Sequence, residues 1–219
     1  SQHNRLTPGP VARCSDGAGA RPGNTGMTLH NTDALPPAWA LIRARSKALG
    51  FDMASDADTG ALLRTLAASR RAGRLLELGT GTGLATACLL AGMDAGASLI
   101  SVDVDAQAQA VARAALGEDP RVTFVLGDGQ TFIRGQAPGS FDLIFADAWP
   151  GKYEGLDDAL GLLRPGGLYI GDDLLPQPNW PDGHQARVDG LIAQLNARPD
   201  LAVTRLDWAT GIVIAVRTA

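Results

Sequence analysis

The feature that most constrains this chain is the run RLLELGTGTGLATA, which begins at Arg74. Its leucine-rich start predicts a short buried strand, and glycines follow at positions 79, 81 and 83. Alanine and leucine dominate from Leu84 onwards, which predicts a helix. A strand, a glycine turn and a helix in this order open a nucleotide-binding α/β unit, because glycine lacks a Cβ atom and lets the backbone lie against a ligand.

The glycine spacing distinguishes between two kinds of ligand. In the dinucleotide fingerprint G-x-G-x-x-G, a pyrophosphate lies on the helix N-terminus. Here the third glycine comes one residue early, and an acid, Glu77, precedes the first glycine. A carboxylate at the strand end suits a cationic ligand better than a pyrophosphate. A purely structural glycine turn would give the same pattern, so residues further along the chain have to decide.

The pattern E-L-G-T-G-T-G resembles the first motif of class I S-adenosylmethionine-dependent methyltransferases. The resemblance extends over residues 27–219, because further motifs follow in the order that this family shows. It implies an α/β fold, a Rossmann-like doubly wound sheet of seven mostly parallel strands with an antiparallel last strand. It also implies that the methyl donor is bound by an acid and loop residues of this motif, Glu77, Gly79, Thr80, Gly81 and Gly83.

Composition narrows the class of protein. The 219 residues, 45% hydrophobic and 19% charged, suffice for one domain with a full core. A net charge of −4 without a basic run argues against nucleic-acid or membrane partners. Cys14 and Cys88 have no disulfide or metal spacing, there is no secretory signal, and no apolar run reaches the ~18 residues of a membrane span. A cytoplasmic protein is expected.

The N-terminal part divides into two stretches. Residues 1–26 are rich in glycine, proline and arginine and predict a disordered tail or an upstream extension, with an ordered arm as the alternative. Residues 27–219 then form a single methyltransferase domain that begins with helices at about 36–49 and 59–68, the second capped by Asp58 or Thr59. In similar small O-methyltransferases, the linker between such helices lies over the donor and shapes the substrate mouth. The alternative is a pair of packing helices, and this region is also the candidate homodimer interface.

Two acids follow the second and third predicted strands. Asp103 comes directly after a strand, where a carboxylate can accept hydrogen bonds from both ribose hydroxyls of an adenosine. Asp105 is the better cap for the next helix, which favours a binding role for Asp103. Asp128 matches the third methyltransferase motif, in which it would reach the adenine amino group, with Gly129 and Gln130 along the base. The alternative is that Asp128 merely caps a short helix.

Three more acids end the fourth and fifth predicted strands, Asp147 after residues 141–146 and Asp172 and Asp173 after residues 168–171. A right-handed crossover makes these strands parallel neighbours, so the acids should meet at one rim. In the catechol-type O-methyltransferases that the chain resembles most, corresponding residues bind a divalent cation, although Asp173 replaces an Asn. Oxygen ligands suit Mg²⁺, Ca²⁺ or Mn²⁺, and a metal lowers the pKa of a bound hydroxyl. The alternative is a set of carboxylates held by backbone N–H groups without a metal.

The identity of the general base does not follow from the resemblance, because Pro150 occupies the position at which that family has a lysine. Lys152 is the nearest lysine and either reaches the acceptor from a reshaped loop or is a solvated surface residue, which is the preferred interpretation. His184 is a further candidate, with helix capping or surface exposure as the alternative. Three aromatic side chains are candidates for the walls of an acceptor pocket, namely Trp149, Tyr153 and Trp180.

The sequence therefore predicts an enzyme that transfers a methyl group from S-adenosylmethionine to a hydroxyl of a small molecule, with Asp147, Lys152 and His184 as candidate catalytic residues. A divalent cation at Asp147, Asp172 and Asp173 is the expected assistant. The alternatives are an NAD-dependent oxidoreductase, for which the glycine fingerprint is wrong, and a protein that binds S-adenosylmethionine without turnover.

Overall fold

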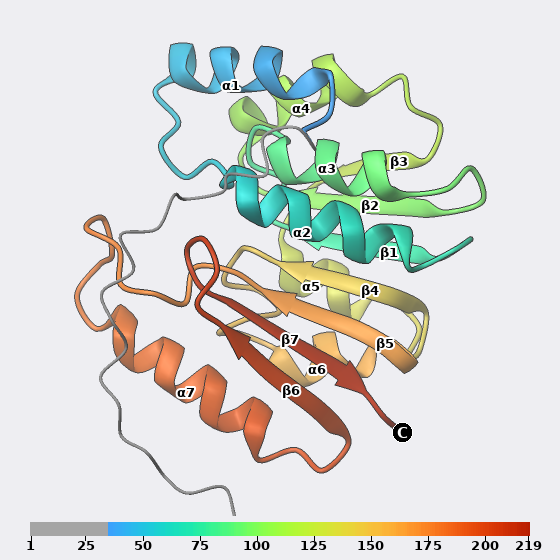
Figure 1. Cartoon of the computed structure of the whole chain (residues 1–219), viewed down its shortest axis with the longest axis vertical. Helices are drawn as coiled ribbons and strands as arrows, with labels where there is room; N and C mark the ends of the chain where they lie inside the picture. The colour runs from blue at the N-terminus through green and yellow to red at the C-terminus, as the bar shows by residue number, and fades with distance from the viewer. Residues whose placement is uncertain (1–34) are drawn as a thin grey trace, which may run out of the picture.

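A computed structural model describes residues 35–219, which form one seven-stranded sheet between layers of helices (Figure 1). The strand order is β3-β2-β1-β4-β5-β7-β6, and β7 is antiparallel to both of its neighbours. The strands span Arg74–Leu78 (β1), Ser98–Asp103 (β2), Val122–Leu126 (β3), Phe141–Ala146 (β4), Leu163–Gly171 (β5), Leu201–Leu206 (β6) and Ile212–Arg217 (β7). The expected doubly wound sheet with an antiparallel last strand is confirmed.

Seven helices in the described part of the chain cover the two faces of this sheet. They span Ala38–Leu49 (α1), Ala57–Ala68 (α2), Leu84–Gly92 (α3), Ala106–Leu116 (α4), Gly129–Arg134 (α5), Leu156–Gly161 (α6) and His184–Asn196 (α7). One apolar cluster joins α2 and α3 to one face, and another joins α5, α6 and α7 to the opposite face. Helix α1 packs outside α3 and α4. In Figure 1, α1 lies at the top near the β3 edge of the sheet, and α7 lies beside β6 at the opposite edge.

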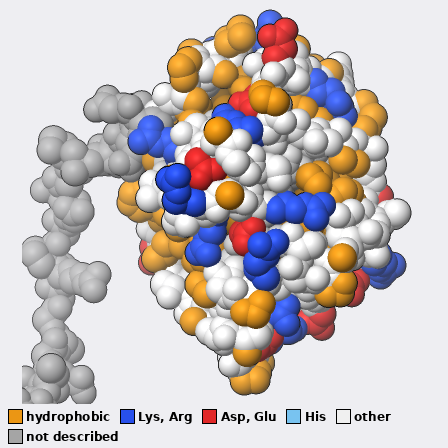
Figure 2. Space-filling view, turned by 90° about the vertical axis from the view of Figure 1, so that its right-hand side faces the viewer, with side chains coloured by type: hydrophobic (Ala, Val, Ile, Leu, Met, Phe, Trp, Pro, Cys, Tyr) orange, Lys and Arg blue, Asp and Glu red, His pale blue; other side chains and the backbone are white. Residues whose placement is uncertain are grey.

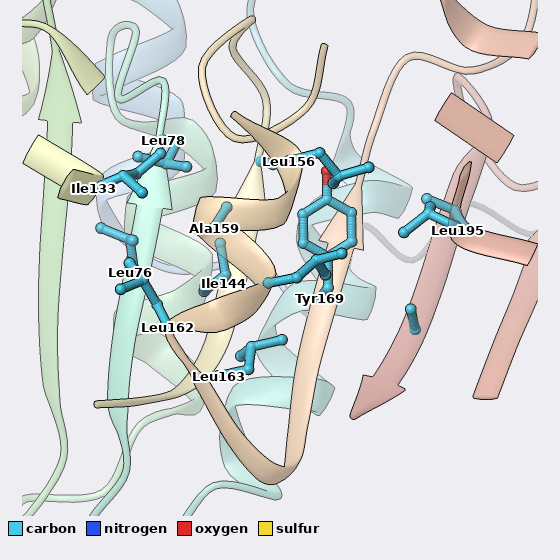
Figure 3. Close-up of a cluster of buried hydrophobic side chains, with 14 of the residues drawn as sticks. Leu76, Leu78, Ile133, Ile144, Leu156, Ala159, Leu162, Leu163, Tyr169 and Leu195 are labelled. Carbon is cyan, nitrogen blue, oxygen red and sulfur yellow. The ribbon is translucent and has the colours of Figure 1, made fainter. Parts of the chain in front are cut away.

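Alternation along the strands sends neighbouring side chains to opposite cores. In β4, Leu143 and Phe145 belong to the α2–α3 side, whereas Ile144 belongs to the α5–α7 side. Tyr169 is fully buried in the second cluster, where the side chains in Figure 3 pack around α6 and β5. Both faces are therefore dry, which explains the near-continuous apolar runs in the central parallel strands.

Two local predictions need correction. Helix α2 is capped by Asp56, whose carboxylate accepts from the backbone N–H of Asp58 at 2.6 Å, and not by Asp58 or Thr59. The strand expected at residues 168–171 begins earlier, because Leu163 already pairs with Phe141 and opens β5. A register shift between Phe141 and Leu143 accommodates the glycine-containing residues 164–167 within the strand. The tail predicted at residues 1–26 lies outside the described residues.

The surface carries no single dominant charge on the face drawn in Figure 2, where basic, acidic and hydrophobic side chains are interspersed. Between residues 35 and 219, no helix is both long enough and apolar enough to cross a membrane.

Candidate active site

Strand register brings four predicted site positions to the same level of the sheet. Leu78 of β1 pairs with Val102 of β2 and with Ala146 of β4, and Ala146 pairs in turn with Gly171 of β5. The next residue on each strand is therefore one of four neighbours along the carboxyl edge, namely Gly79, Asp103, Asp147 and Asp172. Strand order reverses direction at β1 and β4, which is where open α/β sheets bind their ligands.

A cavity of about 710 Å³ opens at this edge. Its lining includes the glycine loop, Asp103, Asp147, Asp172, Asp173, Lys152, His184 and the three aromatic candidates Trp149, Tyr153 and Trp180. Residues 51–56, which connect α1 to α2, also line the cavity. The linker therefore lies beside the site, as expected from the similar small O-methyltransferases. A cavity of this size accommodates a nucleoside-sized ligand together with a small second molecule.

The glycine loop owes its shape to positive φ angles and to close packing. Gly79 has φ +100°, and a Cβ there would lie 2.8 Å from the backbone oxygen of Asp147. Gly83 has φ +97°, and a Cβ there would lie 2.7 Å from the Cβ of Ala112 in α4. Both positions exclude larger residues because of conformation and of space. The loop is thereby pressed against β4 and α4, with its backbone lining the cavity.

Glu77 does not line the cavity, contrary to the expectation that its carboxylate meets the donor. It is fully buried, and its Oε2 accepts from Thr86 at 2.6 Å and from Ser101 at 2.5 Å. Its Oε1 is buried without a hydrogen-bond partner in the described structure. Burial raises the pKa of Glu77 to about 7, against the lowering effect of the two hydroxyls. The side chain thus links β1 to α3 and β2 beneath the loop.

Asp103 faces the cavity and also holds the glycine loop. Its Oδ2 accepts from the backbone N–H of Gly81 at 2.7 Å, and its Oδ1 accepts from that of Asp105 at 2.8 Å. A carboxylate has about four lone-pair positions, so each oxygen can accept one further hydrogen bond. Asp105 caps α4, as predicted, by accepting from Gln107 and Ala108.

Asp128 behaves as the capping alternative predicted. Its Oδ2 accepts from the backbone N–H and the hydroxyl of Thr131, at 2.7 and 2.6 Å, and these bonds lower its pKa. The cavity is lined by its neighbours Gly127 and Gly129 and not by Asp128 itself. Gly129 packs closely on Pro150, so the loop after β4 closes this end of the site.

Lys152 is buried, contrary to the preferred interpretation that it is a solvated residue. It is only 4% exposed, and its Nζ donates to the backbone oxygen of Asp172. The loop after β4 turns it inwards, because Gly151 adopts φ +78° and its carbonyl accepts from the hydroxyl of Tyr169 at 2.9 Å. The lysine thus reaches the strand-end acids from two positions beyond the proline.

Asp147 and Asp172, which follow β4 and β5, are stronger bases in this setting than an ordinary aspartate. Burial, with the nearby carboxylate of Asp172, raises the pKa of Asp147 well above its ordinary value. Burial likewise raises the pKa of Asp172, which hydrogen bonds from Thr210 and from the backbone of Asp173 oppose. The ammonium of Lys152 lowers the pKa of both acids.

Asp173 belongs to a separate arrangement with aromatic residues. Its two oxygens accept from the indole nitrogen of Trp180 at 2.9 and 3.0 Å, and its backbone has φ +60°. The ring of His184 packs on Trp180 with centroids 4.4 Å apart, and its Nε2 lies 3.2 Å from the hydroxyl of Tyr153. Burial lowers the pKa of His184, so a neutral ring is favoured at pH 7. His184 is therefore neither exposed nor a helix cap.

The expected three-carboxylate metal centre is not formed by this arrangement. Within residues 35–219, no group of three or more His, Cys, Asp and Glu side chains is placed to hold a metal ion. Asp172 Oδ1 accepts from Thr210 at 2.5 Å and from the backbone N–H of Asp173 at 2.7 Å. Asp173 is occupied by Trp180. The donor set as it stands does not fit a shared divalent cation.

Thr210 is the site residue that sequence reasoning missed. It lies in the loop between β6 and β7 and lines the cavity beside Asp172. The signal was available in the antiparallel pairing of the last strands: once β7 lies beside β5, the start of β7 must meet the carboxyl end of β5. Gly171 does pair with Val213.

Comparisons with known proteins agree with this site. A family model described as a methyltransferase domain matches residues 76–174. A protein of Mycobacterium sp. (strain KMS) named "Putative O-methyltransferase" is 31% identical over 169 residues, which cover 73% of this chain and 76% of the relative. These matches do not support the oxidoreductase alternative.

Solved structures show the same architecture. The O-methyltransferase TomG from Streptomyces achromogenes, solved in complex with SAM, is 25% identical with a TM-score of 0.72, covering 84% of this chain and 90% of TomG. An O-methyltransferase from Bacillus cereus, solved in complex with SAH, is 21% identical with a TM-score of 0.72, covering 83% and 90% of the two chains. The second likeness is one of fold alone.

Proposed function

Since the chain belongs to the S-adenosylmethionine-dependent O-methyltransferase family, we propose that this cavity holds S-adenosylmethionine and a small-molecule acceptor next to each other. The observation that carries this proposal is the juxtaposition of the glycine loop and Asp103 with Asp147, Asp172 and Lys152 around one space. The first group has the features of a nucleoside site. The second group places charged and polar side chains where a hydroxyl would have to react.

The donor end comprises the loop from Gly79 to Gly83, Asp103 and Gly129. The remaining lone pairs of Asp103 suit the two ribose hydroxyls, since both of its oxygens already accept only one backbone N–H each. Gly129 leaves room for the flat face of the base above the end of β3. Glu77 stabilises this end from within the core, because its carboxylate accepts hydrogen bonds from Thr86 and Ser101. Asp128 contributes by capping α5, so a contact between its carboxylate and the adenine amino group is not part of this proposal.

The acceptor end comprises Asp147, Lys152 and the aromatic residues. Trp149 is 42% exposed at the mouth, and the guanidinium of Arg187 lies 4.4 Å from its ring centroid. Tyr153 and Trp180 line the cavity further in. Such walls favour an acceptor with a flat apolar body and a hydroxyl that points towards Lys152.

His184 is better suited to positioning than to proton transfer. Its ring contacts those of Tyr153 and Trp180, and its Nε2 is within hydrogen-bond distance of the tyrosine hydroxyl. The candidate catalytic residues that adjoin the acceptor are therefore Asp147 and Lys152. The protein's main contribution is to align the acceptor oxygen, the methyl carbon and the sulfonium sulfur in one line.

A small-molecule acceptor, and no nucleic acid, fits the electrostatics. The net charge is −4, and the residues that line the cavity include seven aspartates. A phosphate backbone would be repelled by such a surface.

Calorimetric titration with S-adenosylhomocysteine and with NADH tests the proposal. We expect tight binding of the first and none of the second, and a loss of S-adenosylhomocysteine binding in Asp103→Ala. Asp105→Ala is the matched control, because the carboxylate of Asp105 also lies at the cavity but caps α4 and does not hold the glycine loop. Binding of NADH, or absence of S-adenosylhomocysteine binding to the folded wild type, would refute the assignment.

A further inference from the structure

Lys152 holds a positive charge inside the site at a place where the resemblance had led us to expect a metal. Its side chain is 4% exposed and lines the cavity together with Asp147 and Asp172. Its Nζ donates to the carbonyl oxygen of Asp172 and lies 5.1 Å from the ring centroid of Tyr153. One ammonium thus lies near a backbone carbonyl, the face of a tyrosine ring and the two carboxylates of Asp147 and Asp172.

A buried ammonium is retained only where its lost hydration is compensated. Here the compensation comes from a carbonyl, from the face of Tyr153 and from two carboxylates whose pKa values the lysine lowers. The same groups are those that would surround a divalent cation. Lys152 therefore competes with a metal for the same negative potential.

Asp172 and Asp173 also accept hydrogen bonds from other segments of the chain, with which a metal would have to compete. Asp172 accepts from Thr210, whose loop follows β6, and from the backbone at 173. Asp173 accepts twice from Trp180, in the proline-rich segment that precedes α7. An ion shared by both carboxylates would compete with the indole of Trp180 for the two oxygens of Asp173, and it would bring a double charge against the ammonium of Lys152.

We propose that the ammonium of Lys152 replaces the divalent cation in this site, so that the chain methylates an acceptor without a metal. This inference rests on the proposed methyl transfer. A metal ion binds two neighbouring hydroxyls of an acceptor as a chelate, whereas an ammonium is a point donor with three N–H groups. We therefore expect the acceptor to be a phenol or an enol that has one reacting hydroxyl and requires no second hydroxyl on the neighbouring carbon.

The chemical step balances with the residues present. The acceptor oxygen forms a bond to the methyl carbon while the bond from that carbon to the sulfonium sulfur breaks, and its electron pair stays on sulfur. The products are the methyl ether and S-adenosylhomocysteine. The hydroxyl proton passes to the carboxylate of Asp147, which lines the cavity beside Lys152. The ammonium stabilises the negative charge that develops on the oxygen as this proton leaves.

The first test measures metal binding on the chain saturated with S-adenosylhomocysteine, by the electron paramagnetic resonance signal of free Mn²⁺. We expect no bound Mn²⁺ at millimolar concentration in the wild type. One Mn²⁺ per chain, lost in Asp172→Asn, would overturn the inference and leave the methyltransferase assignment intact. Failure to bind S-adenosylhomocysteine in the preceding calorimetry would instead refute the assignment, so the two failures are distinguishable.

The second test reports the charge on an acceptor-like oxygen directly. The probe is 4-nitrophenol, whose phenolate absorbs visible light, added with S-adenosylhomocysteine and EDTA. We expect the pKa of the bound probe to fall by about one to three units in the wild type. Lys152→Met should abolish this shift, and Lys152→Arg, which keeps the charge, should retain part of it. An equal shift in wild type and Lys152→Met would overturn the role of the lysine, and folding of each variant is verified by S-adenosylhomocysteine binding.

Discussion

The indole nitrogen of Trp180 donates to both carboxylate oxygens of Asp173, at 2.9 and 3.0 Å. Asp173 is one of three non-glycine residues in the described part of the chain with a positive φ, and the bond holds it in that conformation. Trp180 also packs against the ring of His184. One side chain therefore ties the proline-rich segment after β5 both to the strand end and to the start of α7.

Trp180→Phe removes the N–H donor and keeps an aromatic ring. We expect the variant to lose about 1.5–3 kcal/mol, the range for hydrogen bonds to charged groups, and to bind acceptor more weakly with unchanged affinity for S-adenosylhomocysteine. Urea unfolding and calorimetry measure the two quantities. Trp208→Phe is the control, since its indole donates to the carbonyl of Asp58, away from Asp173. An equal fall in S-adenosylhomocysteine affinity would contradict a role confined to the acceptor end.

Glu77 makes stability depend on pH. Its pKa is raised from 4.5 to about 7 by burial, so the folded chain retains a proton that the unfolded chain releases. The free energy of unfolding therefore falls as pH rises from about 4.5 to about 7, by about 3 kcal/mol in total. In Glu77→Gln this contribution disappears. Urea titrations across that range on both proteins isolate it, and parallel curves would show that Glu77 is not the source.

Gly83 should be intolerant of a side chain, whereas Gly190 should not. Gly83→Ala combines φ +97° with a Cβ placed 2.7 Å from that of Ala112, and we expect a loss of more than about 1 kcal/mol. Gly190 lies within α7 with open space around its Cβ position, so Gly190→Ala should gain about 0.5–1 kcal/mol. Thermal unfolding of the two variants side by side is the measurement. Stabilisation by both would mean that the loop does not require its glycine.

Asp103→Ala should weaken S-adenosylhomocysteine binding by about 10- to 150-fold, the equivalent of about 1.5–3 kcal/mol for hydrogen bonds to a charged group. Asp105→Ala should lose about 1 kcal/mol of stability through its helix cap and leave the affinity unchanged. Calorimetry and urea unfolding on both variants separate the effects. If the two aspartates affected affinity equally, the binding role would not belong to Asp103.

The order of strands and helices, the cap at Asp105 and the position of Asp103 followed from the sequence by itself, whereas the cap at Asp128 was only its alternative interpretation. Apolar runs, glycines and capping residues act over a few neighbouring positions, and the parallel crossover has one hand, so a local pattern suffices to place acids at the ends of β2, β4 and β5. The family was recognisable for the same reason. The motif from Glu77 to Gly83 is contiguous.

Only the tertiary structure decided what each of these side chains does. Glu77 points away from the cavity because its carboxylate accepts hydrogen bonds from Ser101 and Thr86 on other elements. Lys152 points inwards because the hydroxyl of Tyr169 in β5 binds the loop that carries it. Asp173 accepts a hydrogen bond from Trp180, and the positive charge next to Asp147 and Asp172 is that of Lys152. Burial and the pairing of charges depend on contacts between segments far apart in the chain, and no spacing within one segment encodes them.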